Sequence, residues 1–393
     1  MSTTVEPSID RYVRRYQSLK PGTSSPLWHE QREEIRDAIK GEDWPWLAAL
    51  ADRLRIETAP AFALVRNDAL FALALVRRPE ALDAFFSRAA SPPPWERPRD
   101  RSGRVWPRQM ASLLGYGQRI EMLERAVVER GADPALREIL CGWVQESVSR
   151  GEPVQQSAVL RRYWAERTLD HHPLTELPLA LLDIEAGAIE ASPHSEDTLG
   201  NWYHFAHHLS SALHGEVETL PDAAVTHELT LLDEARARAA GAFADSTLYP
   251  NGKWEARAFS LHERDIHEGP RSVRSLPLAC LEGAQPSDVR ENIVSEQTAF
   301  GALWSLFTQG GAYSEGDSAA YARLYAWRTL GALCNVPVAG PLALVRDRAA
   351  RAWFTTFGAE SSTWFYHVCI DVGLTCVRPE GRSMIVLAAT DSD

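Results

Sequence analysis

Along about the first 165 residues, apolar side chains recur every three or four positions, the spacing that places them on one face of an α-helix. The first stripe predicts a helix that ends at Pro21 and Gly22, and it consists of Ile9, Tyr12, Val13, Tyr16 and Leu19. A second stripe, over residues 44–54, consists of Trp46, Leu47, Leu50 and Leu54. The N-terminal part of the chain is therefore predicted to be a series of short amphipathic helices.

Further segments of this part also have helical patterns, and they are residues 61–76, 79–86, 118–130, 134–150 and 153–167. The first of them is apolar nearly all round, which predicts an interior helix. Helices this short cannot bury their apolar faces alone, so we expect antiparallel pairs that stack as an α-solenoid or pack as an irregular bundle. The sequence shows no fixed repeat period that would decide between the two.

Residues 91–104, SPPPWERPRDRSGR, interrupt the helical pattern, because their four prolines are incompatible with regular helix and predict an exposed loop. The arginines make this the one basic stretch, so a solvated loop and a contact for an anion or acidic partner are both open. A turn-rich segment at 171–173 then predicts a domain boundary, with a helical domain at residues 1–168 and a second domain at 169–393.

The second domain adds strand patterns to helical ones. Asn251 and Gly252 favour a type I′ turn between residues 246–249 and 253–259, so we predict a β-hairpin there. Three helices are expected after it, at residues 287–308, 317–333 and 342–357.

The end of the chain alternates between apolar and polar positions, which predicts a strand over residues 366–374. A turn at 378–381 and a second strand at 383–388 follow. The fold is therefore predicted to be mainly α, with stacked helices N-terminally and an α+β C-terminal part that holds a small antiparallel β element.

Composition places the chain among globular proteins, since 45% of its residues are hydrophobic and 24% are charged. The net charge of -12 repels phosphate backbones and anionic membranes, so we expect neither nucleic acid nor a membrane as partner. No window holds the roughly 20 apolar residues of a membrane span, and the N-terminus lacks the apolar core of a signal peptide, which predicts a cytoplasmic protein. Five cysteines without a C-x-x-C spacing predict reduced, mostly buried thiols.

A cluster of four histidines is the main candidate for chemistry, and it consists of His204, His207, His208 and His214. On a helix these positions fall within an arc of roughly 120 degrees, so several imidazoles could bind one Zn, Fe or Mn ion with a carboxylate such as Glu216. The pattern lacks the Glu of H-E-x-x-H, and Gly215 would end the helix at the fourth ligand. The alternative is an amphipathic helix with Phe205 and Leu209 on its apolar face and solvated histidines beside it.

Two other clusters favour structural roles. Residues 262–268 mix histidines with charges of both signs, as a solvated loop does. His367, Cys369 and Asp371 share one strand face, but same-face neighbours lie near 7 Å apart and catalytic triads usually draw on separate elements. The sequence contains no phosphate-binding loop, dinucleotide fingerprint, nucleophile elbow or kinase motif, and we expect no resident organic cofactor.

Several segments resemble a bacterial family, typical of actinomycete-like genomes, that is known only as a domain of unknown function. The segments are HHPLTELPL, NGKWEARAF, GGAYSEGDSAAYARLYAWRTLGAL, WFYHVCIDVGL and VRPEGRSMIVLAATDSD. The likeness spans about residues 170–393. It implies a shared helical fold with a small β element, and it carries over no activity, partner or functional residue.

Three functional hypotheses follow. The leading one is a non-enzymatic binding or accessory protein that offers a helical scaffold surface to a protein or small molecule. The second is a metal-dependent tailoring or hydrolytic enzyme built on the histidine cluster, with His214 or His227 as a further ligand and a carboxylate such as Glu216 or Glu228. The third is an immunity or regulatory protein that binds a protein partner through an acidic surface. The sequence leaves the oligomeric state open.

Overall fold

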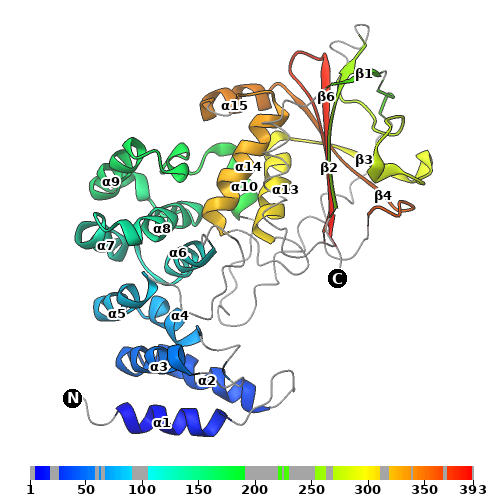
Figure 1. The fold of residues 1–393 in the computed structure, drawn as a ribbon. Helices are drawn as coiled ribbons and strands as arrows, with labels where there is room; N and C mark the ends of the chain where they lie inside the picture. The colour runs from blue at the N-terminus through cyan, green and yellow to red at the C-terminus, as the bar shows by residue number, and fades with distance from the viewer. Residues whose placement is uncertain are drawn as a thin grey trace. The chain divides into compact units, whose positions relative to one another are not determined.

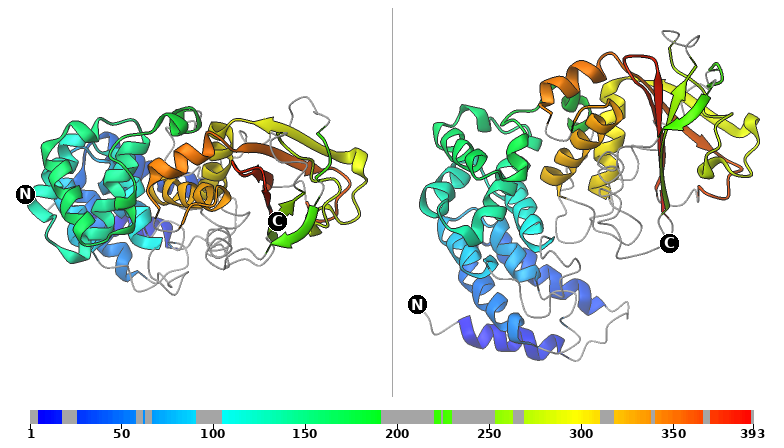
Figure 2. Two further views of the ribbon diagram at one scale, coloured as in Figure 1. Left: turned by 90° about the horizontal axis from the view of Figure 1, so that it is seen from above. Right: turned by 45° about the horizontal axis from the view of Figure 1, so that its top comes forward.

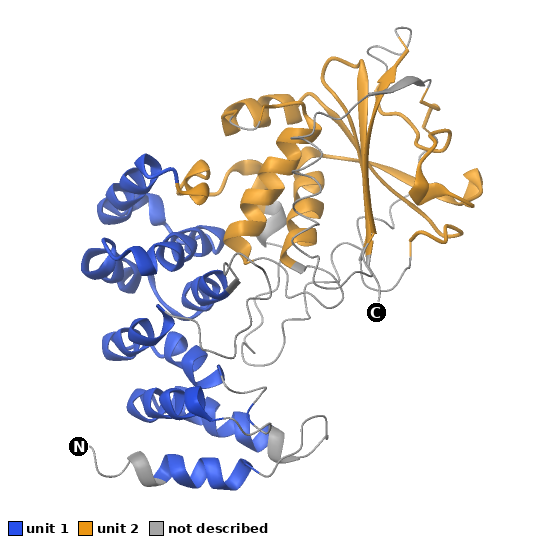
Figure 3. Cartoon of the chain, viewed as in Figure 1, with its two compact units in different colours: residues 1–171 blue, residues 172–393 orange. Residues whose placement is uncertain are grey.

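The structure, a computed structural model, describes residues 5–17, 26–57, 62, 67–90, 105–190, 220–223, 225–229, 253–262, 269–309, 318–337, 340–365 and 370–391. The chain divides into two compact units, residues 1–171 (unit 1) and 172–393 (unit 2) (Figure 3). Unit 1 is helical, and unit 2 combines helices with an antiparallel sheet (Figure 1). The predicted fold class, mainly α with an α+β C-terminal part, is confirmed.

Unit 1 contains a series of described α-helices. They are α1 (Val5–Tyr16), α2 (Pro26–Lys40), α3 (Trp44–Ile56), α4 (Asp68–Leu75), α5 (Pro79–Ala89), α6 (Val105–Gly117), α7 (Ile120–Arg130), α8 (Arg137–Ser149) and α9 (Ala158–Leu169). Side-chain caps start some of them: Asp43 accepts from the Trp46 amide at 3.2 Å, and Ser157 from the Leu160 amide at 3.1 Å. The loop predicted at 91–104 lies outside the described residues.

These helices form two layers within unit 1 (Figures 1 and 2). Helices α2, α4, α6 and α8 pack in succession in one layer, and in the other α3 packs on α5 and α7 on α9. Consecutive helices pack across the layers, as α3 does on α4 and α7 on α8. Packing on near neighbours along the chain is the arrangement of an α-solenoid, one of the two predicted forms.

The α6–α8 contact shows how small side chains set the spacing. Gly142 on α8 faces Ala111 on α6, and a Cβ atom added at Gly142 would lie 2.5 Å from the Cβ of Ala111. A Cβ added at Gly115 would likewise collide with the Cβ of Glu146. Every residue of α8 from Ile139 to Ser149 is buried, so this helix is part of the core.

Unit 2 contains a sheet of six strands in the order β1-β2-β6-β5-β4-β3, and every neighbouring pair is antiparallel. Its strands are β1 (Val225–Leu229), β2 (Lys253–Leu261), β3 (Val289–Val294), β4 (Trp353–Ala359), β5 (Ile370–Val377) and β6 (Ser383–Asp391). Its described α-helices are α10 (Asp183–Glu190), α13 (Glu296–Gln309), α14 (Ala319–Leu333) and α15 (Leu342–Ala349).

The sheet is larger than the small β element that the sequence predicts, because two of its strands lie in segments predicted as helix. Strand β3 lies in the first half of the predicted helix 287–308. Strand β4 begins in the second half of the predicted helix 342–357. Both segments are rich in β-branched or aromatic residues, VRENIV in β3 and WFTTFGA in β4. They pair with each other from Val289–Ala359 to Val294–Phe354, and this long-range ladder overrides the helical period.

The closing hairpin agrees with its prediction. The Arg378 amide donates to the Ser383 carbonyl at 3.0 Å, and Gly381 has φ +66, so the predicted turn at 378–381 joins β5 to β6. The predicted partner strand at 246–249 and the start of the predicted strand at 366–369 lie outside the described residues.

Side chains cover both faces of the sheet. One face forms a core with the irregular segment 273–289, and its buried residues include Phe259, Phe357 and Val386. On the other face Leu306 of α13 packs on Val372 and Ala389. Within the described part of the chain, no helix combines the length and the apolarity that a membrane crossing requires.

A buried ion pair joins α10 to α14 within unit 2. The guanidinium of Arg323 donates to both carboxylate oxygens of Glu185, at 2.6 and 2.8 Å, and both side chains are fully buried. The indole of Trp327 and the amide of Leu182 also donate to this carboxylate, at 2.5 and 2.6 Å. Its four donors satisfy the carboxylate completely, as burial of a charge requires.

Candidate functional site

The predicted metal ligands His204, His207, His208 and His214 lie outside the described residues, as does Glu216. The backbone of His227 and Glu228 belongs to β1, where His227 pairs with Ser260 and Glu228 with Phe259. In the part of the chain that the structure describes, no group of three or more His, Cys, Asp or Glu side chains could hold a metal ion. The metal site therefore stays a prediction.

The other predicted clusters are described only in part. His262 is exposed just after β2, and residues 263–268 lie outside the described residues. Asp371 accepts a hydrogen bond from Thr390 Oγ1 at 2.6 Å across β5 and β6, a structural contact. Its two predicted companions, His367 and Cys369, are not among the described residues.

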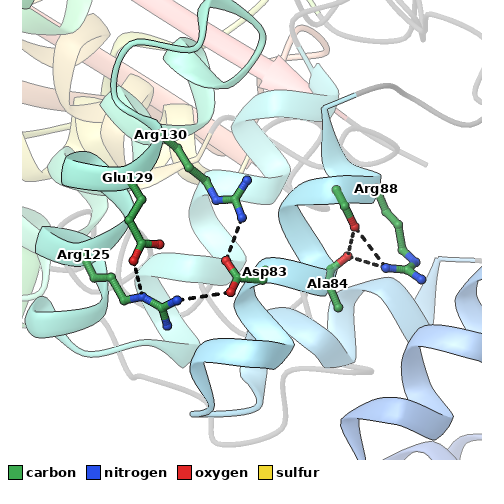
Figure 4. Close-up of polar contacts among 7 residues, drawn as sticks. Asp83, Ala84, Arg88, Arg125, Glu129 and Arg130 are labelled. Atoms are coloured by element: carbon green, nitrogen blue, oxygen red, sulfur yellow. Dashed lines mark hydrogen bonds and ion pairs between the residues drawn. The ribbon is translucent and has the colours of Figure 1, made fainter.

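A polar network on α5 and α7 is the best-defined surface feature of unit 1 (Figure 4). Asp83 of α5 accepts from Arg130 Nη2 at 2.7 Å and from Arg125 Nη2 at 3.2 Å. The Nε of Arg125 also donates to Glu129 at 2.8 Å, so this guanidinium lies between two carboxylates. Both carboxylates raise the pKa of Arg125, with the hydrogen bond to Glu129 as the largest cause.

An apolar side chain stands beside this network. Val128 is 72% exposed and follows Arg125 by three positions on α7, so both side chains lie on one face of that helix. We call Asp83, Arg125, Val128, Glu129 and Arg130 the α5–α7 patch.

Ion pairs continue from the patch toward α3. Arg88 of α5 binds Asp52 of α3 with two hydrogen bonds, Nε to Oδ1 at 2.8 Å and Nη2 to Oδ2 at 2.6 Å. The same guanidinium donates to the carbonyl of Ala84 at 2.7 Å (Figure 4). Arg–carboxylate pairs thus tie α3 to α5 and α5 to α7 along one layer.

The patch has the chemistry of a recognition surface. It combines fixed guanidinium and carboxylate groups with an exposed aliphatic side chain on α7, a mixture found at protein–protein interfaces. The guanidinium of Arg130 also lies 5.4 Å from the centre of the Phe86 ring, which further restricts its motion. Side chains that are already ordered lose less entropy when a partner binds.

The sequence matches the family of unknown function DUF6183 over residues 29–393. This chain belongs to that family. The predicted resemblance to a domain of unknown function is confirmed, and the match to DUF6183 begins well before residue 170, so it includes α3 to α9. No curated protein and no solved structure matches the chain.

The sequence contains one signal for the α5–α7 patch of this DUF6183 protein. In the predicted helix 118–130 the buried stripe is Leu123, Ala126 and Val127, and Val128 is apolar but falls outside it. The ion pairs could not be predicted, because they depend on how α5 and α7 pack.

Proposed function

We propose that this chain is a non-enzymatic binding protein that holds a protein partner on the helical stack of unit 1. The observation that carries the proposal is the position of exposed apolar side chains. In the described part of unit 1, the large hydrophobic residues that are exposed are Ile56, Val128 and Leu169, at 71%, 72% and 80%. They belong to α3, α7 and α9, helices of the same layer.

The layered architecture supports this proposal. Stacked helices expose a row of neighbouring helix faces, and proteins built in this way commonly use such rows to bind other proteins. The ion pairs that join α3, α5 and α7 hold the row in one geometry. This support comes from architecture, so the partner has to be identified by its contacts.

The charge of the two units bears on the choice of surface. Unit 1 contains 26 Lys and Arg against 24 Asp and Glu, a surplus of two positive charges. Unit 2 contains 15 against 29, a surplus of 14 negative charges, so the acidic surplus of the whole chain lies in unit 2. An immunity or regulatory function that relies on an acidic surface would therefore use unit 2.

We also place this binding function in the cytoplasm. The cysteines of the described residues, Cys141, Cys280, Cys334 and Cys376, are free thiols and buried. Burial raises the pKa of the Cys141 thiol to about 12, which keeps it protonated. Free buried thiols suit a reducing compartment.

Affinity purification from the source cells tests the proposal. A triple variant, Ile56→Ser, Val128→Ser and Leu169→Ser, removes the exposed apolar side chains and leaves the core intact. A control variant, Asp37→Ser and Lys40→Ser, changes side chains of α2, in the other layer, that are 73% and 72% exposed. We expect one or more proteins to co-purify with the wild type and the control and to be lost from the triple variant. Equal recovery with all three chains would refute the proposal.

A further inference from the structure

A cleft of about 450 Å³ opens on the surface of unit 2, beside the middle of β2 and the start of β3. Residues 274–286, which cross one face of the sheet, supply most of its wall. The volume lies within the range of 300–1,000 Å³ that is typical of small-molecule sites. We call it the β2 cleft.

The wall of the β2 cleft combines aliphatic residues with polar backbone and guanidinium groups. Eight of its eleven lining residues are aliphatic or proline, and they include Leu276, Leu281 and Val289. These three are also members of the buried core below, so the wall is backed by packed side chains. Such a wall favours an apolar body in the ligand.

Arg257 of β2 is one of two guanidinium groups that line the cleft. Its Nη1 donates to the Pro277 carbonyl, and its guanidinium lies 5.2 Å from the centre of the Phe259 ring. The side chain is 23% exposed. These contacts fix the cation at the mouth of the cleft.

Arg274 is the second guanidinium group that lines the β2 cleft. Its Nη2 donates to the Val289 carbonyl at 3.1 Å, and its Nε lies 3.3 Å from the carboxylate of Glu291. The side chain is 21% exposed. A guanidinium has five N–H donors, so it can hold a protein oxygen and a ligand carboxylate together.

Among the described residues, Glu255 and Glu291 pair with these arginines, also accept hydrogen bonds from backbone amides, and do not line the cleft. Glu255 lies 3.8 Å from Arg257 and accepts from the amides of Ala279 and Cys280, at 3.0 and 2.8 Å. Glu291 is fully buried and accepts from the Val273 amide at 2.7 Å and from Ser272 Oγ at 2.8 Å. Desolvation raises the pKa of Glu291, and these donors oppose the shift.

Among the residues that line the β2 cleft, Arg257 and Arg274 are basic and Glu282 is acidic. Glu255 and Glu291 lie behind this lining, 3.8 and 3.3 Å from the two guanidinium groups, and offset part of their charge. The lining contrasts with unit 2 as a whole, which carries 29 acidic against 15 basic residues. Phosphate is a poorer match than carboxylate, because Glu255 already occupies the amides of Ala279 and Cys280, the kind of donor that phosphate sites use.

We propose that the β2 cleft binds a small organic acid, with its carboxylate on Arg257 and Arg274 and its apolar body against the aliphatic wall. This inference concerns a site separate from the helical stack and does not depend on the proposed partner. It assigns unit 2 a ligand of its own.

Calorimetric titration of the full chain tests the proposal with octanoate, phenylacetate and the uncharged primary amides of both acids. We expect saturable binding of at least one acid, about tenfold or more tighter than its amide, because the amide lacks the charge that the guanidinium groups recognise. Arg257→Gln should weaken binding about tenfold. Ala284→Phe, which fills the apolar part of the cleft and keeps both arginines, should also weaken it.

Arg290→Gln provides the matched control, since Arg290 lies on β3 outside the cleft and pairs with Glu360 at 2.6 Å. It should bind like the wild type. Three outcomes would overturn the proposal: no saturable binding of either acid up to about 10 mM, equal affinity for acid and amide, or undiminished binding by both cleft variants. Phosphate serves as a further probe, and binding of phosphate in preference to the acids would also overturn it.

Discussion

Glu185 is the residue whose neutralisation we expect to destabilise unit 2 most. Its carboxylate accepts from Arg323 Nε and Nη2, from Trp327 Nε1 and from the Leu182 amide. In Glu185→Gln the shape is kept, but the amide group of the new side chain would face N–H donors. The variant also removes the charge with which Glu185 pairs the fully buried guanidinium of Arg323.

The cost of this change follows from burial. Removing one partner of a buried ion pair costs about 3–5 kcal/mol, because the other charge stays buried and uncompensated. Replacing both partners by apolar residues, as in Glu185→Leu with Arg323→Met, should lower the free energy of unfolding much less, since neither charge of this pair then remains buried. The carbonyls of Pro178 and Ala180, which also accept from Arg323, would lose their donors in that double variant.

A matched control lies on the same helix. Arg328 of α14 binds Glu176 with the same two-bond geometry, Nε to Oε2 at 3.0 Å and Nη2 to Oε1 at 2.5 Å. This pair is exposed, at 29% and 46%, so Glu176→Gln should cost less than about 1 kcal/mol.

The assay is urea unfolding combined with hydrogen exchange of the α14 amides, because two compact units need not unfold in a single step. We expect α14 to lose protection in Glu185→Gln and to keep it in Glu176→Gln. Equal effects of the two variants, or a loss below about 1 kcal/mol for Glu185→Gln, would refute the reasoning that burial decides the cost.

Three further predictions concern a buried acid, a close approach in the sheet and the α5–α7 patch. Burial raises the pKa of Asp68 from 3.8 to about 6, although Arg32 lies 3.4 Å away and opposes the shift. The contribution of Asp68 to stability is therefore greatest below about pH 4 and is lost as the pH rises through 6. Asp68→Asn should therefore be more stable than the wild type at pH 8, by up to about 3 kcal/mol, and similar at pH 4 in unfolding curves; a variant less stable at both values would contradict this. Gly373→Ala should lower the free energy of unfolding by about 1–3 kcal/mol, because the added Cβ would lie 2.8 Å from a ring carbon of Phe357. An unchanged midpoint of thermal unfolding would show that the strands can separate to admit the methyl group. Asp83→Ala should cost only about 1 kcal/mol, and less at high salt, because that side chain is 42% exposed; a salt-independent loss would show that packing matters more than charge.

Local patterns predicted seven of the nine described α-helices of unit 1, because each of these carries its own apolar stripe, but α2 and α6 were not predicted. The stripe of the first predicted helix contains Tyr12 and Tyr16, which are buried in α1, and Leu47 and Leu54 are buried in α3. For the residues of β3, the pattern alone predicted part of a helix. Glu291 shows why, since a charged residue in that segment suggests a solvated helix face, yet it is fully buried because Val273 and Ser272 donate to it.

The candidate surfaces were harder to predict than the fold. The guanidinium groups of the β2 cleft come from Arg257 and Arg274, which lie in separate segments, and only the packing of residues 274–286 on the sheet brings them to one wall. The sequence does show an apolar run with prolines in this segment. It does not show that Glu255 and Glu291 accept from backbone amides behind the cleft while two arginines line it.

Photo-cross-linking in the source cells tests the central claim, that unit 1 holds a protein partner on the layer of α3, α5, α7 and α9, most directly. The photoreactive residue p-benzoylphenylalanine would replace Val128 in one chain and Lys40, on α2, in another. The account predicts a defined cross-linked protein with the probe at position 128, absent with the probe at position 40. No cross-link at position 128, or the same products from both positions, would contradict it.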